Sequence, residues 1–352
     1  MAKVISGIQQ VGIGVPDEHS AWQWYRQKFG MDIPIFQEAA EAPLMTRYTG
    51  NKIQSRSATL AINMQGGGGF EIWQFTSRQT QPPEFNIKLG DLGIYSCRIK
   101  SKSVNKTYNR LLNSGADIQS DINHDPSGAP HFFVKDPYGN LFQVVEGERF
   151  FGRGKYETGG QAGCMIGVSD IEKARELYSG ILEYDTVIYD ESGVFDDLQS
   201  LNGGGEKVRR VLLEHSRPRK GTFSRLLGPS KIELVSTYER KPNKIFGNRY
   251  WGDQGFIHLC FDIRNMKELQ KECEAKGFPF TVNSENSFDM GEAAGHFTYL
   301  EDPDGTLIEF VETHRIPIIK KLGWYLNLKN KHPEKPLPNW VLKSLRFNRV
   351  KN

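Results

Sequence analysis

The chain has 352 residues, a length typical of about two domains. Hydrophobic residues make up 38% of it and charged residues 25%, a balance that excludes a disordered chain and a fibrous one. The formal net charge is +3, no run of roughly 18 to 20 uncharged apolar residues occurs, and the start lacks the features of a signal peptide. We therefore expect a cytoplasmic protein that does not enter a membrane.

The first predicted elements are a strand and a helix, and the same pair returns later in the chain. Residues 5–17 read Ile-Ser-Gly-Ile-Gln-Gln-Val-Gly-Ile-Gly-Val-Pro-Asp, which is typical of a strand that ends at a turn. The residues that follow place Trp22, Tyr25 and Phe29 at the spacing of an apolar helix stripe. Because residues 163–181 repeat this pattern, the sequence indicates an internal duplication.

Two shorter copies of the pattern begin at residues 92–99 and 256–263, and each leads into a predicted helix. They also end alike, since residues 135–146 and 301–312 both contain Asp-Pro-x-Gly followed by an apolar run. Such a sequence predicts a turn that opens into a final strand. Each copy is thus predicted to fold as a strand, a helix and several further strands.

No copy is long enough to bury a core alone, so the copies must pair. We expect neighbours in the chain to be partners. The first two copies would then form a domain over residues 5–146, and the last two a domain over residues 160–312. The polar, glycine-containing stretch 147–160 predicts the boundary between them.

Residues 313–352 form a basic extension. Residues 315–352 contain ten Lys or Arg and a single acid, Glu334. A basic arm could contact nucleic acid or anionic lipid, but this segment is also rich in large apolar residues. We therefore expect it to dock on the surface of the domains. Its prolines predict short pieces, with one or two amphipathic turns near Trp340.

Two motifs connect the repeats to a known family. Val-x-Ile-x-Val-Pro-Asp precedes a predicted helix at residues 11–17, and Asp-Pro-x-Gly-x-x-Ile-Glu precedes a final strand at residues 302–309. Both resemble the vicinal oxygen chelate superfamily, which includes glyoxalase I, methylmalonyl-CoA epimerase, extradiol ring-cleaving dioxygenases and bleomycin-resistance proteins. The resemblance covers residues 5–312. It implies an α+β fold in which four βαβββ modules pair into two cup-shaped, mixed-sheet domains, with a divalent metal held by the first and last strands of paired modules.

The resemblance implies three ligand positions in the C-terminal domain. They are His258 on the first strand of the fourth module, Glu309 on its last strand, and Glu233 on the last strand of the third module. The fourth position holds Gly163, which has no side chain to bind a metal. Alternation along the strand places His258 on the polar face and Leu259 on the apolar face.

One imidazole and two carboxylates form a mixed donor set that suits divalent Zn, Ni, Co, Mn or Fe. We therefore expect one such ion in the C-terminal domain. Glu233 is the predicted base as well as a ligand, as a metal-bound glutamate is in glyoxalase-like members, while His258 and Glu309 are predicted anchors. His296 is predicted to line the same cup as a proton shuttle or hydrogen-bond donor, with a purely structural histidine as the alternative.

The N-terminal domain offers weaker ligands. Its corresponding positions hold Gln10, Glu71, Ile94 and Gln143, although a shift of two residues would replace Ile94 by Ser96. Two neutral amides and one carboxylate supply little charge to hold a transition metal. We therefore expect this domain to be metal-free, with a structural or substrate-enclosing role.

Three functions stay open at this point. A divalent-metal-dependent lyase, isomerase or epimerase would abstract a proton beside a carbonyl of a small substrate with vicinal oxygens. An Fe(II) extradiol dioxygenase would need two histidines and a carboxylate, and Gly163 lies where its first histidine belongs. A bleomycin-resistance-like protein would sequester a ligand without turnover. We favour the first, with a small-molecule substrate, no nucleic-acid or membrane partner, and a monomer or homodimer.

Overall fold

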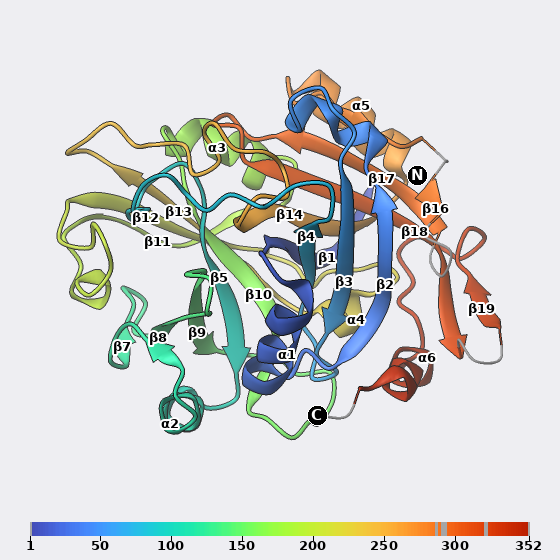
Figure 1. Cartoon of the computed structure of the whole chain (residues 1–352), viewed down its shortest axis with the longest axis horizontal. Coiled ribbons are helices and arrows are strands. Elements are labelled where there is room, and N and C mark those ends of the chain that lie inside the picture. The colour runs from blue at the N-terminus through green and yellow to red at the C-terminus, as the bar shows by residue number, and fades with distance from the viewer. Residues whose placement is uncertain (1, 286–287, 290–293, 320–322, 351–352) are drawn as a thin grey trace.

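The computed structural model describes residues 2–285, 288–289, 294–319 and 323–350. Figure 1 shows the elements in chain order. The first module contains β1 (Val4–Gly14), α1 (Glu18–Phe29), β2 (Ile33–Glu41), η1 (Pro43–Tyr48), β3 (Ser55–Ile62) and β4 (Gly69–Phe75). The second contains β5 (Gly93–Ser101), α2 (Val104–Asn113), β6 (Asp117–Ile118), β7 (Asn123–His124), β8 (Pro130–Lys135) and β9 (Leu141–Glu146).

The second half of the chain repeats this order. The third module contains β10 (Thr158–Gly167), α3 (Ile171–Tyr178), β11 (Thr186–Gly193), η2 (Asp196–Leu198), β12 (Val208–Glu214), α4 (Ser224–Leu227) and β13 (Lys231–Thr237). The fourth contains β14 (Gly255–Arg264), α5 (Met266–Ala275), β15 (Val282–Asn283), β16 (Phe288–Asp289), β17 (Ala294–Glu301) and β18 (Leu307–Ile319). The extension adds β19 (Trp324–Asn327), α6 (Asn339–Ser344) and η4 (Leu345–Asn348). In the described ranges, no helix combines the length and apolarity that crossing a bilayer demands.

The strand-to-helix turns follow from the aspartates that end the first strands. Asp17 caps α1, because its Oδ1 accepts a hydrogen bond of 2.9 Å from the backbone N–H of Ser20. Asp170 caps α3 in the same way, with a bond of 3.1 Å from Lys173 N. The α1 helix ends at Gly30, which adopts the left-handed conformation with φ +69° that favours glycine. The repeated motif therefore fixes the start of both helices.

The strands form two curled, mixed sheets, and the predicted α+β class is confirmed. Sheet A has the order β15-β17-β18-β14-β1-β4-β3-β2, with β16 beside β17 and β19 beside β18. Sheet B has the order β11-β12-β13-β10-β5-β9-β8-β6, with β7 beside β8. Each sheet therefore combines two modules.

The pairing of modules differs from the expected one. The first strand of module one, β1, pairs antiparallel with β14 of module four, for example Val11 with Leu259. Likewise, β5 of module two pairs with β10 of module three, with Gln161 opposite Ile99. Residues 5–146 and 160–312 therefore do not close one cup each, and every cup takes strands from both halves of the chain. The expectation failed because strand pairing is a long-range choice that neighbourhood in sequence does not fix.

The main core lies between the two sheets and joins them. Tyr25 of α1 makes edge contacts with Phe70 of sheet A, at a centroid distance of 5.0 Å, and with Phe142 of sheet B, at 5.8 Å. Phe142 also contacts Phe256 of β14, with centroids 5.4 Å apart. Leu259 is buried in this core, as alternation along β14 predicts.

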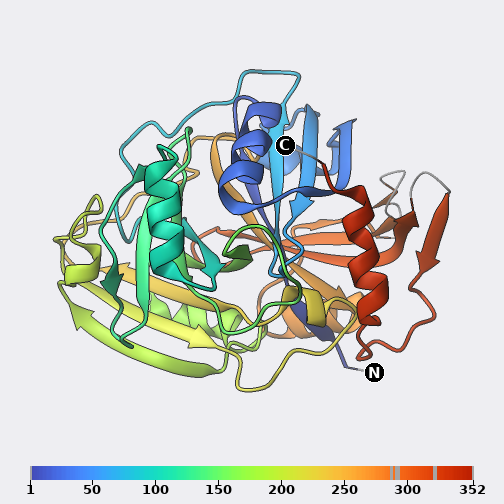
Figure 2. The same cartoon turned by 90° about the horizontal axis from the view of Figure 1, so that it is seen from below.

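The extension becomes part of sheet A before it turns away. Strand β18 runs on to residue 319 and pairs with β19, and η4 then packs against β2 and β18. Figure 2 shows α6 (red) beside the strands of the fourth module (orange). Leu342 and Leu345 enter an apolar cluster with Leu226 of α4 and Ile316 of β18, whereas Trp340 keeps 63% of its surface exposed. One face of the extension is therefore buried against both halves of the chain.

A candidate metal centre at the base of a cavity in sheet A

Three acidic or imidazole side chains converge in sheet A. They are Glu71 on β4, His258 on β14 and Glu309 on β18, and one potential ligand atom of each lies within 4.8 Å of the others. His258 Nε2 is 3.2 Å from Glu71 Oε2 and 3.1 Å from Glu309 Oε2. All three are buried. No other group of three or more His, Cys, Asp or Glu side chains in the described ranges is close enough to share an ion.

Gln10 on β1 completes the set. Its Nε2 donates a hydrogen bond of 3.1 Å to Glu71 Oε2, and the side chain is 4% exposed. The four residues therefore come from the first and last strands of modules one and four.

The strand registers explain why the four side chains meet. In module one, Glu71 lies opposite Gly12, two residues beyond Gln10. In module four, Glu309 lies opposite Cys260, two residues beyond His258. Because residues two apart share one face of a strand, each module presents the same pair of positions to the same side.

Gly12 provides the space for the imidazole. It is the register partner of His258, and a Cβ at this position would lie 2.4 Å from His258 Cε1. Any larger residue would overlap the ring, so the first strand of module one needs a residue without a side chain where it passes His258.

Three buried polar atoms of the centre make no hydrogen bond with the described residues. They are His258 Nε2, Glu309 Oε2 and Gln10 Oε1. The first two meet in an ion pair at 3.1 Å, but buried polar atoms without hydrogen bonds are still costly in a protein interior. A divalent ion would satisfy all three, since imidazole nitrogen and carboxylate or amide oxygen form a mixed donor set suited to Zn, Ni, Co, Mn or Fe. The residues present therefore fit a metal ion.

The electrostatics of the three side chains are coupled. Burial alone would lower the pKa of His258, but the neighbouring carboxylates of Glu309 and Glu71 raise this pKa to about 9. Burial conversely favours the neutral form of Glu71, yet His258 lowers its pKa below the usual value. The Tyr299 hydroxyl lies 3.5 Å from His258 Nδ1, while Nε2 of the same ring faces Glu71 and Glu309. Tyr299 therefore helps to hold the ring in this orientation.

The centre lies at the base of a cavity of about 460 Å³. Gln10, Glu71 and Glu309 form part of its lining. Most of the remaining wall is apolar, and its aromatic members include Phe36, Trp73, Trp251, Phe297 and Tyr299. This volume falls in the range of about 300–1,000 Å³ that is usual for small-molecule pockets.

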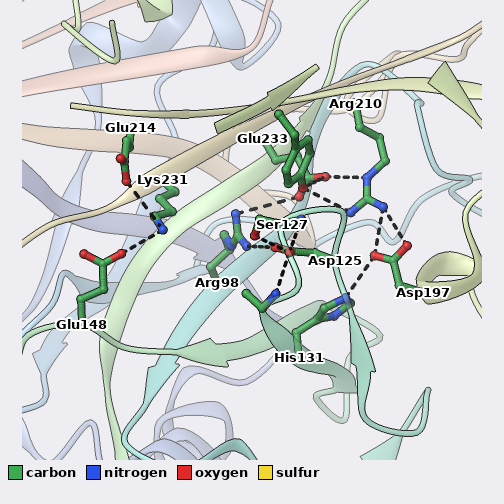
Figure 3. A network of polar contacts seen from close by, with 12 residues as sticks. Arg98, Asp125, Ser127, His131, Glu148, Asp197, Arg210, Glu214, Lys231 and Glu233 are labelled. Atoms are coloured by element: carbon green, nitrogen blue, oxygen red, sulfur yellow. Dashed lines mark hydrogen bonds and ion pairs between the residues drawn. The ribbon is translucent and has the colours of Figure 1, made fainter. Parts of the chain in front are cut away.

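Glu233 does not join the centre, and its predicted role as ligand and base is corrected. Its strand β13 belongs to sheet B, whereas His258 and Glu309 lie in sheet A. Figure 3 shows its carboxylate facing Arg210. Glu233 Oε1 accepts hydrogen bonds from Arg210 Nε at 2.7 Å and from the Tyr189 hydroxyl at 2.8 Å. Both charged side chains are fully buried, so each serves as the counter-ion of the other.

The surrounding positions of sheet B extend this ion pair into a network. Arg210 Nη1 donates to Asp197 Oδ1 at 2.8 Å, and His131 Nε2 lies 3.1 Å from Asp197 Oδ2. Arg98 is also buried, with Nη1 3.9 Å from Glu233 Oε2 and Nη2 4.0 Å from Asp125 Oδ2. Arginines therefore occupy the cup of sheet B where the resemblance implied a metal.

The remaining sheet B positions are poor ligands. Gln143 lies opposite Arg98, so the residue two before it, Ser96, takes the place that His258 has in sheet A. This register favours Ser96 over Ile94. Gly163 adopts φ +131°, and a Cβ there would lie 1.7 Å from the carbonyl oxygen of Lys231, so this strand position cannot carry a ligand side chain.

His296 does not line the cavity. Its neighbours Gly295 and Phe297 are among the lining residues, so His296 lies on the other face of β17. Its Nε2 is 2.6 Å from Asn283 Oδ1, and burial lowers its pKa. The position of His296 is that of the structural alternative, which corrects the expected place in the cup.

Glu71 and Gln10 are the site residues whose grouping the sequence did not predict. Both were at family ligand positions, but the N-terminal half was expected to be metal-free. The available signal was the position itself, because each residue occupies the same place in module one as His258 and Glu309 do in module four. Knowledge that modules one and four pair would have assembled all four.

Comparison with known proteins identifies the family. A model of the Glyoxalase/Bleomycin resistance protein/Dioxygenase superfamily matches residues 7–144 and 160–310, and the chain belongs to this superfamily. The resemblance seen in the sequence is thereby confirmed. A search of curated proteins finds no match.

Solved structures with the same fold support this assignment. Glyoxalase I from Zea mays matches with a TM-score of 0.53 and 13% identity, over 88% of this chain and 92% of its own. A candidate dioxygenase from Bacillus subtilis matches with a TM-score of 0.56 and 14% identity, over 88% of this chain and 86% of its own. At these identities the likeness shows a shared fold and nothing of the reaction.

Proposed function

We propose that the chain is a divalent-metal-dependent enzyme of the lyase, isomerase or epimerase type, acting on a small substrate with two adjacent oxygens. Glu71, His258 and Glu309 would hold the ion, with Gln10 as a fourth, neutral donor. The observation that carries the proposal is the convergence of these side chains beside a cavity of substrate size, with buried atoms that make no hydrogen bond with the described residues. Because one chain supplies all four, a monomer suffices, and a homodimer would need no shared site.

When bound, the ion would act as a Lewis acid on the substrate oxygens. The protein itself supplies the proton acceptor. Glu309 is the better candidate, since it lines the cavity and its Oε2 is ion-paired with His258 but accepts no hydrogen bond from the described residues, whereas Glu71 Oε2 accepts one from Gln10. Tyr299 keeps His258 in place during the transfer. The apolar walls exclude water from the carbon that loses its proton.

Metal analysis of the purified protein tests the proposal. We expect near-stoichiometric divalent metal in the native protein and at least about a tenfold loss in His258→Ala, since ligand removal leaves only oxygen donors. His124→Ala is the matched control, because His124 is exposed on β7 and should retain the metal. Native protein without specific metal occupancy would refute the proposal.

The two other functions can be separated by experiment. A ring-cleaving dioxygenase should consume oxygen with catechols after anaerobic loading with Fe(II), and no uptake over a broad catechol panel would exclude it. This centre contains one imidazole among its four donors, where such enzymes use two. A ligand-sequestering protein should keep its ligand affinity after treatment with a chelator, whereas the proposed enzyme should lose it.

A further inference from the structure

The cavity above the centre has a wall chemistry that restricts what can occupy it. Apart from Glu71 and Glu309, the charged residues among its lining are Glu38, Glu41 and Arg56. The single cation of this set, Arg56, is already paired, since its Nη2 donates to Glu38 Oε1 at 2.7 Å and its Nη1 to the Glu38 carbonyl. The described lining therefore offers no spare positive charge to an anionic substrate group.

The rest of the wall comes from four parts of the chain, of which the fourth module contributes Phe297, Tyr299 and Val311. Phe36, Leu60 and Trp73 come from the first module. The third module contributes Phe223, Leu226 and Leu227 around α4, and the extension beyond residue 312 contributes Thr313, Ile316 and Leu345. Nearly all of these side chains are apolar. The C-terminal extension is thus a wall of the cavity as well as a docked segment.

We infer that the substrate is a small molecule with two adjacent oxygens at one end and an uncharged, apolar alkyl or aryl body. This inference rests on the proposed function, which supplies the chelating end. The body would lie between the aromatic walls of sheet A and the side chains of Leu226 and Leu345. A substrate with a second anionic group or a peptide-like polar body would bury charge or amide groups without partners.

A series of hydroxamates tests the inference, because a hydroxamate presents two adjacent oxygens to a metal. The protein is loaded with Co(II), its metal content is measured, and binding is followed by calorimetry. Each buried methylene should tighten binding about fourfold. We expect octanohydroxamate to bind at least about a hundredfold more tightly than acetohydroxamate. A hydroxamate with the same eight-carbon chain and a carboxylate at its far end should bind at least about tenfold more weakly than octanohydroxamate.

Two wall variants locate the body of the ligand. Leu345→Ala removes apolar surface from the extension and Leu226→Ala removes it from α4, and each should weaken octanohydroxamate roughly tenfold while leaving acetohydroxamate unchanged. Trp340→Ala is the control, because Trp340 lies on α6 with 63% of its surface exposed. It should change neither affinity.

The outcomes distinguish this inference from the proposed function. If the protein binds Co(II) but shows no dependence on chain length, or prefers the carboxylate-bearing chain, the inference is wrong and the metal enzyme stands. A chain-length dependence that survives both leucine variants would also overturn it, since the body would then lie elsewhere. If the native protein fails to bind Co(II), the proposed function itself is refuted, and the chelating end of the substrate with it.

Discussion

At the scale of single residues, the centre depends on what is missing as well as on what is present. Gly12→Ala places a methyl group 2.4 Å from His258 Cε1 in a strand whose backbone cannot retreat. The imidazole must move, so we expect metal affinity to fall at least about tenfold, because ligand geometry must be held within about 0.5 Å. Titration with Co(II) measures the change.

Gly193→Ala serves as the control for this prediction. Gly193 ends β11, and a Cβ there meets no atom within 4 Å. Its affinity should equal that of the native protein. Equal affinities of native protein and Gly12→Ala would show that the imidazole position does not determine metal binding.

For Glu233 we expect a change in stability and none in metal binding, because its carboxylate is paired with Arg210 and lies outside the candidate metal centre. Glu233→Gln keeps the shape of the side chain but leaves the fully buried Arg210 without one of its counter-ions. Removing one partner of a buried ion pair costs about 3–5 kcal/mol, so we expect the free energy of unfolding in urea to fall by about 3 kcal/mol. Metal content should stay at the native level, and a loss of metal without a loss of stability would place Glu233 in the centre after all.

At the scale of elements, the helices connect modules whose strands lie in different sheets. The Tyr25 hydroxyl of α1 donates to Asp136 Oδ2 at 2.5 Å, and the Tyr178 hydroxyl of α3 donates to Asp302 Oδ2 at 3.0 Å. Both aspartates belong to the Asp-Pro-x-Gly turns of the next module. Modules that are consecutive in sequence are therefore joined by a helix-to-turn contact, although their strands find other partners.

Tyr178→Phe tests this contact. The change leaves the buried Asp302 without one donor, and we expect the free energy of unfolding to fall by about 1–3 kcal/mol. Tyr238→Phe is the control, since Tyr238 is 57% exposed and should have almost no effect. Chemical unfolding measures both, and equal stabilities would show that the hydroxyl contributes nothing.

The same contact predicts a pH dependence. Burial raises the pKa of Asp302 from 3.8 to about 6, although hydrogen bonds, including that of Tyr178, oppose the rise. Between these values the folded protein binds more protons than the unfolded chain, so the Asp302 contribution to stability should decrease as pH rises from about 4 to 6. In Tyr178→Phe the pKa should be higher still, and the decrease should continue above pH 6. Urea unfolding at a series of pH values measures this difference.

The sequence predicted the positions of the site better than their grouping. Gln10, Glu71, His258 and Glu309 all occupy family ligand positions, and the repeated strand motif was enough to find them. Their grouping depends on which first strands pair, and all four first strands carry much the same alternation. Because side chains alternate along a strand with a period of two, a shift of two residues leaves the same face buried. The choice of Ser96 over Ile94 as the equivalent of His258 therefore needed the observed register.

At the scale of the whole molecule, the two halves of the chain are interleaved. Sheet A needs β1 from one half and β14 from the other, and sheet B needs β5 and β10 in the same way. Residues 147–157, between β9 and β10, therefore link two halves that cannot close their sheets alone.

Cutting the chain within this stretch tests the interleaving. We expect fragments 1–152 and 153–352, produced separately, to lack a cooperative unfolding transition, because each would expose two unpaired first strands. Produced together, they should recover the transition and bind Co(II). If either fragment unfolds cooperatively or binds the ion alone, the paired sheets do not represent the folded protein.

The placement of the centre in the first and last modules has a consequence during synthesis. Gln10 leaves the ribosome early, but β14 and β18, which carry the other half of the donor set, emerge only after all of sheet B has been made. Domains fold as their segments become available. Sheet B, with its arginine network, can thus fold first. One edge of β1 stays unpaired until β14 of the fourth module has been synthesised. An ion held by these four donors would therefore be bound last, after nearly all the surrounding structure has formed.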